Sequence, residues 1–94
     1  MRILKLYSDA SELTSAMRRL ALSNYKRVGR FSDEHLVVEL VNGVEVYFRY
    51  VIDKESAMRQ LTGLCFTFIE YYGSVDREVI EFAQTRIRDP RDYS

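Results

Sequence analysis

Few side chains in this chain of 94 residues are placed to do covalent chemistry. The single histidine, His35, follows Asp33 and Glu34 at the start of an expected strand, and the single cysteine, Cys65, lies on an apolar stripe. Nucleophilic catalysis needs a base beside the nucleophile, and acid–base catalysis needs two groups at a working distance. One cysteine and one histidine cannot complete a zinc site of the Cys/His type. We therefore expect a protein that is not an enzyme and holds no cofactor or metal.

The composition excludes further classes. The chain has neither a GxxxxGK[ST] loop nor a GxGxxG motif, so nucleotide hydrolysis has no support. It has no run of about 18 apolar residues, and Arg2 and Lys5 do not precede the apolar core of a secretion signal. We expect one cytoplasmic domain over residues 1–94, with a frayed tail at 89–94.

Tyrosine and arginine side chains are the better candidates for function. These residue types are enriched at the energetic centres of protein interfaces. The chain has seven tyrosines, several of them close to arginine or to one another. We expect the partner-binding residues to be Tyr47, Arg49, Tyr50, Tyr71 and Tyr72.

Charge is unevenly distributed, although 14 basic and 14 acidic residues balance overall. Residues 1–30 carry seven basic and two acidic side chains, a net of +5, and residues 31–94 carry seven and twelve, a net of −5. A basic stretch with aromatic neighbours is typical of nucleic-acid binding. The alternative binding set is therefore Arg18, Arg19, Lys26, Arg27 and Arg30, with Tyr25 and Phe31 available for stacking.

The N-terminal third predicts a strand followed by a helix. Residues 2–7 are short and apolar enough for a strand, and Asp9 with Glu12 has the form of a capping box. Apolar residues then recur with helical spacing, which predicts a helix over 10–24. Residues 26–32 have no clear period, so we expect a basic connector there.

Residues 35–51 predict a β-hairpin that turns at Asn42-Gly43. A three-residue loop, with Gly43 in the left-handed conformation, places every apolar side chain on one face. The pairs that this register predicts are Leu40 with Val44, Val38 with Val46, and Leu36 with Phe48. On the other face Glu39 and Glu45 lie opposite each other. We favour simple solvation of this like-charge pair, and the alternative is a cation or an arginine-bearing partner between them.

Residues 53–72 allow two interpretations. Eight apolar residues fit one helical stripe that begins after Asp53 and ends before Gly73, and we favour this single helix. The alternative is a short helix that ends at Gly63, followed by a buried strand over 64–69, because glycine disfavours helix and residues 66–69 favour strand.

A last helix is predicted to begin after Ser74 and to run to about Arg88. Asp76 and Glu78 in its first turn and Arg86 and Arg88 in its last turn would complement the helix dipole. The predicted fold is thus α+β, a small single domain in the order β-α-β-β-α-α, with an antiparallel hairpin and helices packed on one sheet face.

One order of motifs has a counterpart in a known family. The motifs are Asn42-Gly43, Tyr47-Phe48-Arg49, residues 59–64, an apolar run to Ile69, and residues 79–88. This order resembles the middle of the ATPase domain of phage terminase large subunits, where an Asn-Gly hairpin ending in Phe-Arg precedes a Walker B strand. The chain lacks that family's phosphate-binding loop and has Glu70-Tyr71 in place of its Asp-Glu. The resemblance implies a relic or mimic without hydrolysis and transfers no functional residue.

Three functions follow as hypotheses. The first is a protein-binding module, an inhibitor or adaptor of the kind that phages and other mobile elements encode. The second is a nucleic-acid-binding protein that uses the basic stretch. The third, which no motif supports, is an enzyme of unrecognised type. A homodimer is compatible with all three, because a small core and an exposed hairpin edge favour self-association.

Overall fold

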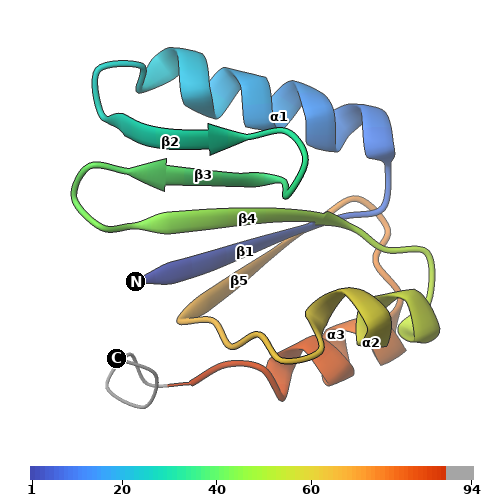
Figure 1. The fold of residues 1–94 in the computed structure, drawn as a ribbon. Helices are drawn as coiled ribbons and strands as arrows, with labels where there is room; N and C mark the ends of the chain where they lie inside the picture. The colour runs from blue at the N-terminus through green and yellow to red at the C-terminus, as the bar shows by residue number, and fades with distance from the viewer. Residues whose placement is uncertain (89–94) are drawn as a thin grey trace.

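The computed structural model describes residues 1–88 of the chain (Figure 1). Its helices are α1 (Ala10–Ser23), α2 (Lys54–Leu61) and α3 (Arg77–Gln84). Its strands are β1 (Arg2–Tyr7), β2 (Val28–Ser32), β3 (Val37–Leu40), β4 (Glu45–Tyr50) and β5 (Phe68–Tyr72). The α+β class is confirmed, with two strands more than predicted. The expected tail at 89–94 lies outside the described residues.

The strands form one mixed sheet in the order β2-β3-β4-β1-β5. Strand β1 lies next to the edge strand β5 and is parallel to both of its neighbours, β4 and β5. Strands β2, β3 and β4 are joined as antiparallel pairs. The two edge strands are therefore paired differently: β2 is antiparallel to its neighbour, and β5 is parallel to its neighbour.

Helices cover both faces of the sheet, which corrects the prediction of one covered face. Successive residues of β1 point to opposite sides: Leu4 and Leu6 pack with α2 and α3, and Tyr7 packs with α1. In Figure 1, α1 lies above the strands and the α2–α3 pair lies below them. The core is consequently divided into two layers, with fully buried Phe48 on the α1 side and fully buried Phe66 on the other.

The predicted hairpin and its register are confirmed. Val38 pairs with Val46, the Leu40 N–H donates to the Val44 carbonyl over 2.8 Å, and the Phe48 N–H donates to the Leu36 carbonyl over 2.9 Å. Gly43 adopts φ +89°, the left-handed conformation that the three-residue loop requires.

The single helix predicted over 53–72 is wrong, and the alternative interpretation is closer. Gly63 has φ +79°, which a helix cannot contain, and α2 ends just before it. The strand that follows, β5, begins at Phe68 rather than Leu64 and pairs with β1. A continuous helix would have left one side of β1 without hydrogen-bond partners, so sheet pairing outweighs helical periodicity here.

The basic connector predicted at 26–32 is also corrected, because most of it forms β2. The pairing of β2 with β3 shifts between Val28 and Arg30, which marks a bulge at Gly29. The bulge interrupts the alternation of inward and outward residues, so the sequence shows no period of two.

The ends of two helices compare directly with their predictions. The Asp9 carboxylate accepts from the Ser11 and Glu12 backbone N–H groups at 2.8 and 3.2 Å, so α1 begins as predicted and ends one residue earlier. Helix α3 begins after Asp76 rather than Ser74 and ends at Gln84, so Arg86 and Arg88 follow the helix rather than lie in its last turn.

Candidate binding surfaces on the two flanks of α1

The tyrosines predicted to bind a partner do not form one surface. Tyr47 and Tyr71 pack against the α2–α3 layer, whereas Tyr50 and Tyr72 pack against the α1 layer. Alternation along β4 and β5 separates them, because residues two apart share a face and neighbours do not. Of these four residues, only Tyr72 lines a hollow on the surface.

Arg49 is used within the fold. Its guanidinium donates to the carbonyls of His35, Leu36 and Phe48 at 2.9, 3.3 and 2.8 Å, and lies 5.6 Å from the centre of the Tyr47 ring. Burial lowers the pKa of Arg49. These bonds support the turn at Leu36, whose φ of +55° is unusual for a leucine. The side chain is therefore a structural clamp between β4 and the start of β3.

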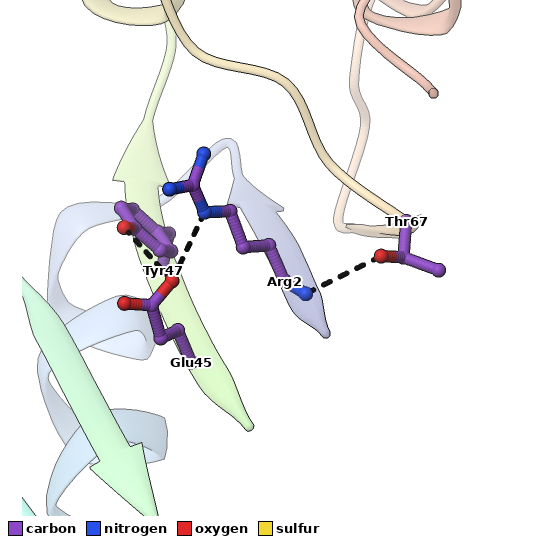
Figure 2. A network of polar contacts seen from close by, with 4 residues as sticks. All are labelled: Arg2, Glu45, Tyr47 and Thr67. Atoms are coloured by element: carbon purple, nitrogen blue, oxygen red, sulfur yellow. Dashed lines mark hydrogen bonds and ion pairs between the residues drawn. The ribbon is translucent and has the colours of Figure 1, made fainter. Parts of the chain in front are cut away.

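One of the two facing glutamates of the hairpin, Glu45, has an ion-pair partner among residues 1–88. Glu39 and Glu45 lie opposite each other as predicted. Figure 2 shows the Arg2 Nε bonded to Glu45 Oε2 at 3.0 Å, with the Tyr47 hydroxyl 3.4 Å from the same oxygen. Arg2 on β1 thus offsets the charge of Glu45, and Glu39 lies opposite Arg30 in the pairing of β3 with β2.

A different surface is open on the α1 side of β1 and β5. Three cross-strand pairs form its floor, namely Ile3 with Phe68, Lys5 with Glu70, and Tyr7 with Tyr72. We call these six residues the platform. The platform is apolar at one end, aromatic at the other and charged between them. Phe68 is 54% exposed, which is unusual for an aromatic side chain on a sheet face.

The aromatic end of the platform is rigid. The rings of Tyr7 and Tyr72 stack with their centres 4.7 Å apart and their planes 10° from parallel. The Tyr72 hydroxyl donates to Glu70 Oε2 at 2.8 Å, and Lys5 Nζ lies 3.4 Å from the same oxygen. Burial, helped by the Glu70 hydrogen bond, raises the pKa of Tyr72 to about 12. Burial also raises the pKa of Tyr7.

Helix α1 turns the aromatic end of the platform into a groove of about 550 Å³. The helix lies over β4 and β1, and one of its flanks forms the wall of the groove. The wall residues are spaced along the helix and are Glu12, Ala16, Arg19, Leu20 and Ser23. Gly73 closes the end of the groove with φ +82°, and a Cβ there would lie 2.1 Å from Ser8 Oγ. The Ser8 side chain therefore packs against the Gly73 backbone at this end of the groove.

The five cations of the predicted nucleic-acid set are divided by the fold. Arg19 faces the groove, whereas Arg18 lines a second hollow on the opposite flank of α1. Arg30 is the β2 partner of Glu39 and points to the other sheet face, because the next residue, Phe31, pairs with the α1-facing Val38. Three of the five, Arg18, Lys26 and Arg27, remain on the β2 flank of α1 and its following turn.

The single histidine and the single cysteine line neither the groove nor the hollows on the β2 flank of α1. His35 is exposed near the β2–β3 turn and Cys65 is half-buried in the loop before β5. Within residues 1–88, no three histidine, cysteine or acidic side chains are grouped to hold a metal ion. Over the same residues, no helix has the length and apolar character needed to cross a membrane.

Sequence reasoning missed the platform because it depends on β5. Tyr72 was the one member predicted to bind, and the other five were not, namely Ile3, Lys5, Tyr7, Phe68 and Glu70. Once residues 68–72 are recognised as a strand beside 2–7, the alternation in both segments identifies the platform.

Comparisons with protein-family models, with curated proteins and with solved structures found no match to this chain. The resemblance to terminase large subunits therefore stays a prediction.

Proposed function

We propose that this protein is a non-enzymatic binding module that captures an amphipathic helix of a partner protein on the platform, alongside α1. One observation carries the proposal: the parallel pair β1–β5 is covered by helices on one face and leaves Phe68 54% exposed on the other. Parallel strands are normally covered on both faces. A partner helix beside α1 would complete the missing part of that layer.

The chemistry of the platform and of the groove wall fits one face of a helix. Phe68, Ile3 and the Tyr7–Tyr72 stack offer apolar and aromatic contact to side chains that recur every three or four residues. The charges of Lys5 and Glu70 offset each other at 3.4 Å, so the floor attracts neither sign strongly. On the wall, Glu12 lies in the first turn of α1 and Arg19 lies about two turns further along the helix. A partner helix with a basic residue toward Glu12 and an acidic residue toward Arg19 complements both.

The proposed site holds no nucleophile–base pair, so we propose that the protein acts by occupying a surface of its partner. Blocking or bridging a partner is how a small inhibitor or adaptor acts, and the protein would be of the kind that phages and other mobile elements encode. We propose that it meets its partner in the cytoplasm.

Position-specific photo-crosslinking in cells of the source organism tests this proposal. Phe68 is replaced by p-benzoylphenylalanine, and the matched control carries the same residue at Ile52, which is 69% exposed in the loop between β4 and α2. We expect an adduct with a helical segment of one protein at position 68 and none at 52. Arg19→Glu should weaken that adduct several-fold, because it reverses the charge on the wall.

Three results would contradict the proposal. The first is the lack of any adduct at position 68, and the second is the same adduct at 52. The third is an adduct with a second copy of this chain, which would replace the foreign partner by a homodimer. Because Phe68 is exposed, thermal melting should show that the substituted protein stays folded.

A further inference from the structure

The β2 flank of α1 carries exposed rings among exposed cations. Tyr25 is 69% exposed in the turn after α1, and Phe31 is 39% exposed on β2. Arg18 and Phe31 line one hollow, and Tyr25, Lys26 and Arg27 line the next. The turn is fixed to the hairpin, since the Val41 N–H donates to the Arg27 carbonyl over 2.7 Å. We call Arg18, Tyr25, Lys26, Arg27 and Phe31 the basic surface.

The cations of the basic surface are not neutralised by the chain. The ion pairs within residues 1–88 are Arg2–Glu45, Lys5–Glu70 and Arg77–Glu81, and none includes a member of the basic surface. The one acid lining these hollows is Asp33, beside Arg18 and Phe31. Lys26 Nζ lies 5.8 Å from the Tyr25 ring centre, which keeps one cation next to one stacking face.

We infer that the basic surface binds single-stranded nucleic acid. Three unpaired cations supply phosphate contacts, and two exposed rings supply stacking platforms that accept any base. Duplexes keep their bases stacked inside, so they cannot use the rings. An anionic membrane typically needs four to eight clustered lysines and arginines, and the basic surface has three. Arg18 and Phe31 lie on the flank of α1 opposite the groove, whereas the hollow of Tyr25, Lys26 and Arg27 meets the groove at one residue, Ser23.

Fluorescence anisotropy with a labelled oligothymidylate of about 15 nucleotides tests the inference on the full chain. Three phosphate contacts at roughly 0.7 each predict that log K falls against log salt with a slope of about −2. Lys26→Gln with Arg27→Gln should lower the affinity and reduce the slope to about −0.7. Its matched control, Lys54→Gln with Arg59→Gln on α2, removes the same two residue types from a distant exposed helix and should change neither.

The rings are tested separately from the charges. Tyr25→Ala should weaken oligothymidylate binding roughly tenfold while leaving the salt slope unchanged, because stacking releases no counterions. Equal affinity for a duplex, or no effect of Tyr25→Ala, would overturn the inference. So would binding to phosphatidylserine vesicles without binding to the oligonucleotide, since that result assigns the surface to a membrane. Phe68→Asp should leave oligonucleotide binding intact, so this inference can fail or hold independently of the proposed groove.

Discussion

The two flanks of α1 carry similar residue types in opposite environments. On the β5 flank the rings of Tyr7 and Tyr72 are stacked and largely buried, and Lys5 is paired with Glu70. On the β2 flank Tyr25 is exposed and the neighbouring cations have no ion-pair partner among the described residues. One surface is shaped and close to neutral, whereas the other is open and positive.

This difference shows why residue type alone is a poor guide to a binding site. Arg49 looks like an interface residue in the sequence, yet its guanidinium bonds to the carbonyls of His35 and Leu36 within the fold. What distinguishes a candidate surface is the interaction that the fold leaves incomplete: an uncovered parallel pair in the groove, and uncompensated charge on the basic surface.

Replacing Gly73, at the end of the groove, should lower stability more than replacing Gly43, in the hairpin turn. Gly73→Ala places a Cβ against Ser8 Oγ in a backbone with φ +82°, so we expect the free energy of unfolding to fall by about 2–3 kcal/mol. Gly43→Ala has the same backbone strain but open space around it and should cost about 1 kcal/mol. Urea denaturation measures both, and equal losses would show that the Ser8 side chain does not pack against the Gly73 backbone.

The tyrosine stack should behave as one unit. In a double-mutant cycle, Tyr7→Leu and Tyr72→Leu should show a coupling of about 1 kcal/mol in stability, as expected for stacked rings. The same cycle with Tyr25→Leu and Phe31→Leu should give a coupling close to zero, because those rings are exposed. Coupling on the β2 flank would remove the contrast between the surfaces.

Alkaline pH should destabilise the groove side. The neutral form of Tyr72 is favoured in the fold, where its pKa is about 12, above the ordinary value of 10.0. Below pH 10 this contribution to stability is fully present, and it is lost as pH rises from 10 to 12, because the unfolded state then releases its proton first. Denaturation midpoints across this range should fall less steeply for Tyr72→Phe than for the native protein.

Charge removal should barely change stability on either flank. Glu70→Gln breaks a half-exposed ion pair and should cost about 0.5 kcal/mol at low salt and less at high salt. Arg27→Gln removes an unpaired exposed cation and should stay within about 0.5 kcal/mol of the native protein at any salt. A larger loss for Arg27→Gln would mean that the basic surface has a structural role.

Local patterns predicted much of the fold and little of the site. The strand at 2–7, the helix from Ala10 and the hairpin register follow from spacing, a cap and one turn glycine. The strand at 68–72 does not, because its apolar residues also fit a helix and only its pairing with β1 decides between them. The platform consists of residues from β1 and β5 lying side by side. It could not be predicted once residues 68–72 were assigned to a helix.

The most direct test of the account places the photo-crosslinker at Phe68 and at Tyr25 in parallel, with and without nuclease treatment of the cross-linked lysate. The account predicts a protein adduct at position 68 that resists nuclease, and at position 25 an adduct whose mass falls on nuclease treatment. A nuclease-sensitive adduct at 68, or the same protein cross-linked at both positions, would contradict the claim that α1 separates two independent binding surfaces.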